Sequence, residues 1–134
     1  MKKYVLLDHT ADIKYKVNGN TLSEIFENII FAVSEYLSSG EKVQSKVSKV
    51  IEVRGHDKES LMYNFIEEIL FLVDSENFIP SKSEVLIRGN NLRAELFGDK
   101  ASDYPINHIK APTYNDMAIN KQGNEWQAII VLDV

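Results

Sequence analysis

The chain has 134 residues and no cysteine, which excludes disulfides, thiolate catalysis and zinc sites built on sulfur. Hydrophobic residues make up 44% of the chain and charged residues 26%, the balance of one ordinary globular domain spanning 1–134. The formal net charge of −5 argues against strong direct binding of nucleic acid, because phosphate recognition needs clustered Lys and Arg. A direct partner is therefore expected to be another protein.

The N-terminal segment, residues 1–7, combines two lysines with a short apolar run, and Asp8 and His9 follow at once. This arrangement leaves no room for the apolar core and cleavage site of a signal peptide. No apolar run elsewhere approaches the roughly 20 residues that a membrane-spanning helix needs. We therefore predict a cytoplasmic protein without a membrane segment, and a first strand over residues 1–7.

Two periodicities predict strands and helices in the first half of the chain. Residues 13–18 alternate between apolar and polar, which is typical of a strand. Apolar residues at helical spacing then predict a helix from Thr21 to Leu37, whose first residues have a capping-box arrangement. A second alternating segment, 47–54, leads to a second amphipathic helix from Lys58 to Asp74 with Asp57 as its N-cap.

The second half of the chain is predicted to be strands. Residues 85–96 form a hairpin around the turn residues 89–91, and shorter strands follow near 108–113 and 117–120. The final run, 126–132, is apolar on both faces, which favours a central strand covered on both sides. The predicted fold class is α+β, a two-layer domain in which two amphipathic helices pack on a mixed, mostly antiparallel β-sheet.

Candidate functional residues begin in the segment between the first two predicted strands. Asp8, His9, Thr10 and Asp12 place two carboxylates, an imidazole and a hydroxyl within five positions of a short connection. The alternative is an ordinary turn in which these side chains bond local backbone amides. The segment by itself leaves both interpretations open.

The last residues of the sequence form a second candidate. Asp133 and Val134 follow a strongly apolar strand, so carboxylate and backbone oxygens would gather at one strand end. Together with Asp12 they would suit Ca²⁺ or Mg²⁺, because hard cations prefer oxygen ligands. The alternative is a solvated tail, and no periodicity places Asp12 beside Asp133.

A third polar segment, residues 107–117, contains His108 and Lys110, and Pro112 in it forces an edge strand or a bulge. His108 is more simply an exposed histidine, and His56 belongs to a plain loop before the second helix. The sequence contains no glycine-rich phosphate loop, no GxSxG elbow and no HExxH motif. Catalysis by this chain is therefore disfavoured.

Four segments taken together make the sequence similar to the archease family. They occur in order and at family-like spacing, and the resemblance covers essentially the whole chain. Asn115 departs from the pattern, since the family often has His there, and Pro112 stands where a small or β-branched residue is usual. The matching segments are His9-Thr10-Ala11-Asp12-Ile13, Thr21-Leu22-Ser23-Glu24-Ile25-Phe26-Glu27-Asn28, Ile109-Lys110-Ala111-Pro112-Thr113-Tyr114 and Leu132-Asp133-Val134.

The resemblance implies a protein cofactor of the RtcB-type tRNA-splicing RNA ligase rather than an enzyme. Archeases promote guanylylation and multiple turnover of that ligase, and can broaden its use of nucleotides. They bind a divalent cation, which implies calcium here, with magnesium as the alternative. The implied ligands are Asp12, Asp133 and Val134, the last through a backbone or terminal carboxylate oxygen. The residues implied to line the same acidic tip or to contact the partner are Asp8, His9 and Lys110.

Two other functions stay open at this point. A general chaperone or modulator of RNA-modifying enzymes would act without a metal step, so chelation would change nothing. A metal-dependent phosphohydrolase would use Asp8, His9, Asp12 and His108, and would turn over a phosphate substrate with Mg²⁺ or Mn²⁺.

Overall fold

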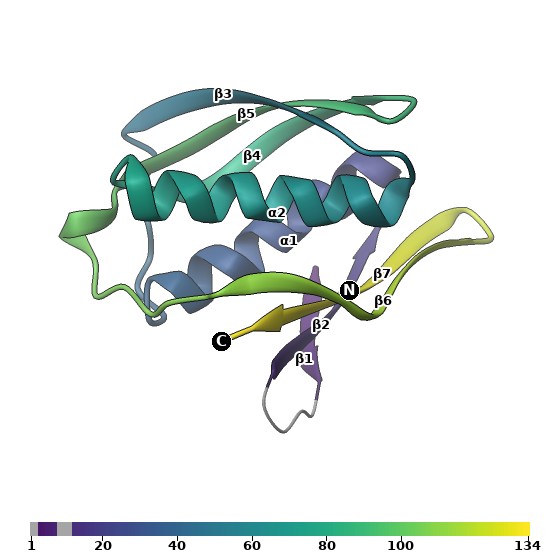
Figure 1. Cartoon of the computed structure of the whole chain (residues 1–134), viewed down its shortest axis with the longest axis horizontal. Coiled ribbons are helices and arrows are strands. Elements are labelled where there is room, and N and C mark those ends of the chain that lie inside the picture. The colour runs from purple at the N-terminus through teal and green to yellow at the C-terminus, as the bar shows by residue number, and fades with distance from the viewer. Residues whose placement is uncertain (1–2, 8–11) are drawn as a thin grey trace.

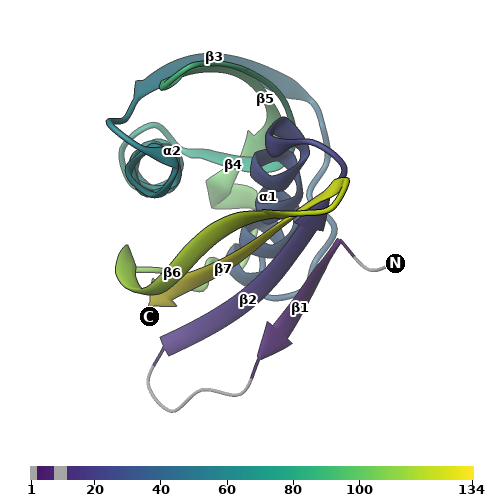
Figure 2. The ribbon, with the colours of Figure 1, turned by 90° about the vertical axis from the view of Figure 1, so that its right-hand side faces the viewer.

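The computed structural model describes residues 3–7 and 12–134, and arranges them as a sheet, a pair of helices and a second sheet (Figure 1). A view turned by 90° shows the same layers (Figure 2). In chain order the elements are β1 (Tyr4–Leu7), β2 (Asp12–Gly19), α1 (Leu22–Leu37), β3 (Val47–Arg54), α2 (Lys58–Ser75), β4 (Phe78–Arg88), β5 (Asn91–Lys100), the short 3₁₀ helix η1 (Ala101–Asp103), β6 (Ala111–Gln122) and β7 (Glu125–Asp133).

Both helices begin at the caps that the sequence predicts. The Thr21 hydroxyl accepts a hydrogen bond from the backbone N–H of Glu24 at 3.1 Å. The Asp57 carboxylate accepts from the backbone N–H of Ser60 at 2.7 Å, and the Ser60 hydroxyl accepts from the backbone N–H of Asp57 at 3.1 Å. These bonds satisfy N–H groups that have no partner within the helix. In the part of the chain that the structure describes, neither helix is long and apolar enough to span a membrane.

The described strands form two antiparallel sheets. Sheet A has four strands in the order β1-β2-β7-β6, and sheet B has three in the order β3-β5-β4. The predicted hairpin is the β4–β5 pair, and Gly89 in its turn has φ +59°, a left-handed conformation that glycine adopts without steric cost.

The predicted α+β class, with two helices packed on antiparallel strands, is confirmed. The strands form two sheets rather than one because α1 is buried around more than half of its circumference, through neighbouring pairs such as Ile25-Phe26 and Ile29-Ile30. One sheet covers only one side of a helix, so α1 contacts β4 of sheet B and β2 of sheet A. One cluster of buried side chains joins both sheets and both helices.

β6 lies at the edge of sheet A, and its pairing with β7 shifts register between Thr113 and Ala118. Asp116 within this irregularity has φ +59°. The two strands predicted near 108–113 and 117–120 are therefore one bulged strand, and the edge or bulge expected from Pro112 is confirmed. β7 is central, as predicted, and on its outer face Val131 is 4% exposed and Ile129 is half-buried.

Candidate metal centre at the end of sheet A

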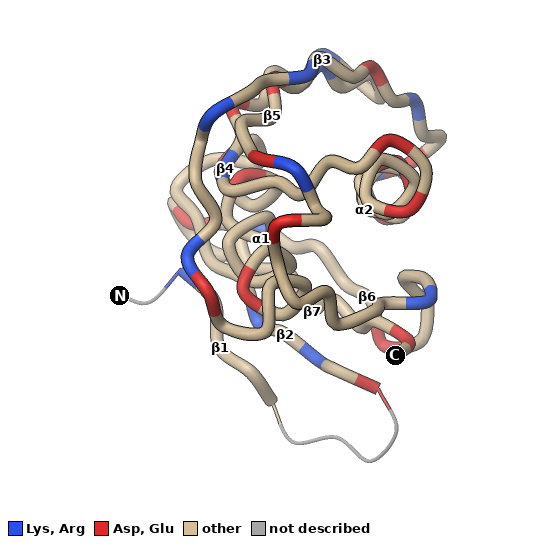
Figure 3. The backbone as a smooth tube through the Cα atoms, turned by 90° about the vertical axis from the view of Figure 1, so that its left-hand side faces the viewer, with Lys and Arg blue, Asp and Glu red and all other residues tan. Residues whose placement is uncertain are grey.

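The pairing of β2 with β7 brings the two candidate aspartates together. Asp12 opens β2, Asp133 closes β7, and the two residues are direct cross-strand partners. Their inner neighbours, Ile13 and Leu132, are also partners and are buried against the helices. Because side chains alternate along a strand, both carboxylates project from the outer face of sheet A. The acidic positions at the start of β2 and the end of β7 lie side by side in Figure 3.

The end of β7 is held on its other side by the edge strand β6. Ala111 is the cross-strand partner of Asp133, and the backbone N–H of Lys110 donates to the carbonyl oxygen of Asp133 at 2.8 Å. The Lys110 side chain is exposed, whereas Val134 is half-buried and packs against the core. The residues around Asp133 are therefore positioned by hydrogen bonds and by apolar packing, and do not form a solvated tail.

The paired aspartates carry like charges with little visible compensation. Opposed residues of an antiparallel pair lie about 5 Å apart at Cα, and like charges directly opposite are destabilising. Lys14, two residues from Asp12 on the same face of β2, forms an ion pair with Asp116 at 3.4 Å. Among the described residues, neither Asp12 nor Asp133 forms an ion pair within 4.0 Å. A bound cation would remove this repulsion.

The oxygen atoms at this site are of the kind that a hard cation binds, but the described side chains supply too few of them to complete its shell. Two carboxylates and nearby backbone carbonyls are the oxygen ligands that Ca²⁺ and Mg²⁺ prefer. Within residues 3–7 and 12–134 no group of three or more His, Asp or Glu side chains is arranged to hold a metal, so backbone oxygens and water would complete the shell. Asp8 and His9 lie outside the described residues. The metal role of Asp12, Asp133 and Val134 stays a prediction.

Tyr114, from the third polar segment, has a structural role that the sequence does not indicate. Its ring stacks on Tyr63 of α2, with centroids 4.4 Å apart and an angle of 7° between the ring planes. Partial burial, followed by the charges of neighbouring groups, raises the pKa of Tyr114, which is 52% exposed. The stack therefore ties the bulged part of β6 to α2. His56 and His108, the two histidines among the described residues, are both exposed.

The fold and the site together define a small α+β protein that offers paired carboxylates at one end of a sheet. The model of the Archease protein family (MTH1598/TM1083) matches residues 4–134. Protein archease of Pyrococcus abyssi is 37% identical over 142 residues, and that of Sulfurisphaera tokodaii is 36% identical over 141 residues. Both alignments cover 100% of each chain. The chain therefore belongs to the archease family.

Two solved structures have the same fold. The solution structure of Methanobacterium thermoautotrophicum protein 1598 is similar with a TM-score of 0.80, 25% identity and 100% coverage of both chains. The crystal structure of an archease from Thermotoga maritima, described as a possible chaperone, has a TM-score of 0.65 at 22% identity. That match covers 96% of this chain and 94% of the other. The resemblance seen in the sequence is confirmed at the level of family and fold.

Proposed function

We propose that this protein is an activator of an RtcB-type tRNA-splicing RNA ligase and not an enzyme itself. It presents the Asp12–Asp133 end of sheet A, with a bound divalent cation, to the ligase in the cytoplasm. There it promotes guanylylation and multiple turnover, and widens the range of nucleotides that the ligase accepts. The single observation that supports this most is the cross-strand pairing of the two aspartates in a member of the archease family.

The proposed cation is calcium, with magnesium as the alternative. Its ligands are the carboxylates of Asp12 and Asp133 and a backbone oxygen of Val134, with Asp8, His9 and Lys110 around them. Calcium tolerates irregular shells of six to eight oxygens, which suits a site where only two described carboxylates meet. Magnesium demands a near-ideal octahedron and keeps several waters, so it would bind more weakly here.

The charge of the molecule supports a protein rather than RNA as the direct partner. The net charge is −5, and the acidic residues that Figure 3 shows along α2 would repel a phosphate backbone. A negatively charged end carrying a cation can instead contact a basic, nucleotide-binding active site of another protein. The carboxylates would then help to position a metal or a nucleotide during guanylylation.

The test is a turnover assay of the cognate ligase with and without this protein. Asp12→Asn and Asp133→Asn each remove one charge while keeping the side-chain volume, and we expect both to abolish the stimulation. Asp103→Asn, at an exposed position of η1, is the matched control and should stimulate normally. Stimulation by the two site variants equal to that by the unchanged protein would refute the proposal.

A chaperone-like function is the second candidate, favoured by the description of the Thermotoga maritima relative as a possible chaperone. Such a protein would raise the yield of folded ligase rather than the rate of each guanylylation. Removing divalent cations from the activator by chelation, followed by repurification, separates the two. Chelation should weaken a metal-dependent activator and leave a chaperone unchanged.

A further inference from the structure

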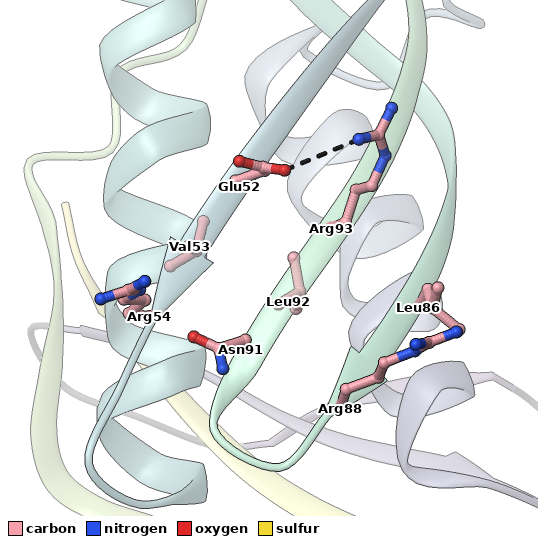
Figure 4. A pocket seen from close by; sticks show the side chains of 8 residues that line it. All are labelled: Glu52, Val53, Arg54, Leu86, Arg88, Asn91, Leu92 and Arg93. Atoms are coloured by element: carbon pink, nitrogen blue, oxygen red, sulfur yellow. Dashed lines mark ion pairs between the residues drawn. The ribbon is translucent and has the colours of Figure 1, made fainter.

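All three arginines of the chain, Arg54, Arg88 and Arg93, lie at one end of the outer face of sheet B (Figure 4). They come from three different strands, since Arg54 ends β3, Arg88 ends β4 and Arg93 lies on β5. The chain has twelve lysines besides them. A surface that only needed solubility could use either residue, so the gathering of every arginine at one place points to recognition.

The register of sheet B shows how the arginines are aligned. Arg54 and Arg88 are the cross-strand partners of Asn91 on its two sides, so the three residues form one row across the sheet. The next row on the same face contains Glu52, Arg93 and Leu86. With neighbouring strands about 4.8 Å apart, the Cα atoms of Arg54 and Arg88 are separated by roughly 10 Å. Two guanidinium groups therefore flank the Asn91 amide.

Two of the three arginines form no ion pair with another described residue. Arg93 pairs with Glu52 at 3.6 Å, but both side chains are largely exposed, so solvent weakens the pair. Among the described residues, neither Arg54 nor Arg88 has a carboxylate within 4.0 Å. A guanidinium binds a carboxylate or a phosphate through two parallel hydrogen bonds, which a lysine ammonium cannot do.

The surroundings of the arginines favour a protein ligand over nucleic acid. The residues enclose a hollow of about 600 Å³, and Leu86 at its rim is 53% exposed. Val50, further along the same face of β3, is 52% exposed. Arginine beside exposed apolar side chains is the composition of protein–protein interfaces. Glu52 beside Arg93, and Glu84 and Glu95 in the next row of the same face, would repel a phosphate chain. Single carboxylates can still reach the Arg54–Asn91–Arg88 row, which contains no acidic residue.

This surface lies far from the paired aspartates. Sheet B and the end of β7 are on opposite sides of the helix layer in both views (Figures 1 and 2). A partner engaged at the Asp12–Asp133 end would therefore leave the arginine surface accessible. Binding of a partner at the arginines is consequently independent of the proposed activation of a ligase.

We propose that the Arg54–Asn91–Arg88 row, with Arg93 and Leu86, is a docking surface for an acidic protein segment. The segment presents carboxylates to the arginines and an apolar side chain to Leu86. Charge complementarity carries this assignment, because the Arg54–Asn91–Arg88 row has two arginines and no carboxylate in a chain with a net charge of −5. The protein would then have a second partner, bound on the side opposite the candidate metal centre.

Nuclear magnetic resonance can test the surface directly, because the three arginines supply the only side-chain Nε–H signals of that kind in the chain. The probe is the blocked peptide Glu-Leu-Glu-Leu-Glu-Leu-Glu, titrated into the full-length protein. We expect all three signals to shift together and saturate. The comparison probes are the same peptide with Lys for Glu and a single-stranded oligouridylate of equal charge.

Variants distinguish specific docking from general attraction. Arg54→Gln with Arg88→Gln should weaken the acidic peptide about tenfold, since two exposed charge pairs are lost. The control, Lys42→Gln with Lys121→Gln, changes the net charge equally at exposed positions elsewhere and should leave the affinity unchanged. Unshifted arginine signals, equal weakening in both variants, or tighter binding of the oligouridylate would each overturn the proposal. Shifts that depend on protein concentration without peptide would assign the surface to a second copy and overturn it too.

Discussion

Removing one of the two opposed aspartates should change the stability of the protein in a way that depends on calcium. Without divalent cations the variant should be more stable than the unchanged protein, and with calcium it should be less stable. Asp12 and Asp133 face each other across β2 and β7 on the outer, solvated face of sheet A. At a separation of about 5 Å in water, two like charges repel by about 1 kcal/mol. Asp133→Asn removes that repulsion while keeping the shape of the side chain.

This repulsion energy is large enough to change the unfolding temperature measurably. A gain of about 1 kcal/mol raises the unfolding midpoint of a domain of this size by about 4 °C. The measurement is thermal unfolding followed by circular dichroism in a chelating buffer at low salt, because added salt screens exposed charges. Calcium at a hundredfold excess over its Kd would stabilise the unchanged protein by about 2.7 kcal/mol, and this stabilisation should be largely lost in Asp133→Asn.

A matched control separates relief of repulsion from loss of a cation ligand. Glu84 and Glu95 are direct cross-strand partners on sheet B, so Glu84→Gln also removes one of two opposed carboxylates. We expect Glu84→Gln to be stabilised in chelator while it keeps the full response to calcium. If Asp133→Asn unfolds at a lower temperature than the unchanged protein in chelator, the two aspartates do not repel each other. If it responds to calcium as fully as the unchanged protein, Asp133 is not a calcium ligand.

Three further predictions concern the core and its response to pH. Burial raises the pKa of Tyr15 from its ordinary value of 10.0 to about 12, so the folded state keeps a proton that the unfolded state releases. The free energy of unfolding should therefore fall as pH rises from 10.0 to about 12, and Tyr15→Phe should flatten that fall in urea titrations at several pH values. Phe65 is fully buried and packs edge-to-face on Phe26, with ring centroids 5.6 Å apart. Phe65→Ala should therefore lower the free energy of unfolding, measured in urea, by about 4 kcal/mol. A loss below about 1 kcal/mol would contradict this packing. A Cβ added at Gly98 would collide with the carbonyl oxygen of Ile79. Gly98→Ala should therefore lower the free energy of unfolding by about 2 kcal/mol in the same assay. An unchanged urea midpoint would show that β4 and β5 can move apart at this position without loss of stability.

The local features of this protein follow from its sequence alone. The helices begin after Thr21 and Asp57, as predicted, because each of these N-caps accepts a hydrogen bond from the backbone N–H three residues further on. The β4–β5 turn is likewise local, since Gly89 provides the backbone conformation that a tight hairpin needs. Helix caps and tight turns of this kind can be predicted from nearby residues, without knowledge of the rest of the fold. The apolar spacing that predicts α1 has the same short range.

The division of the strands between two sheets was not predictable from those signals. A stripe of apolar residues shows that a helix is buried, but it does not say how many surfaces cover it. The width of the buried face of α1 indicates cover on two sides only once the neighbours are known. Similarly, the residues of β6 contain the reason for a bulge in Pro112, yet only pairing with β7 joins the two predicted segments into one strand.

Both candidate sites depend on pairings between distant parts of the chain. Asp12 and Asp133 meet because β2 pairs with β7, and one residue of slippage would turn a carboxylate toward the core. The family resemblance anticipated their association, whereas hydrophobic periodicity contains no information about which strands become neighbours. Arg54, Arg88 and Arg93 lie on three strands, and nothing in their spacing predicts that they share one face of sheet B. The helices, their caps and the alternation within each strand follow from the residues alone, because those features depend on neighbours a few positions away. The places where charges gather depend on the complete fold, because strand order and register are set by burial across the whole molecule.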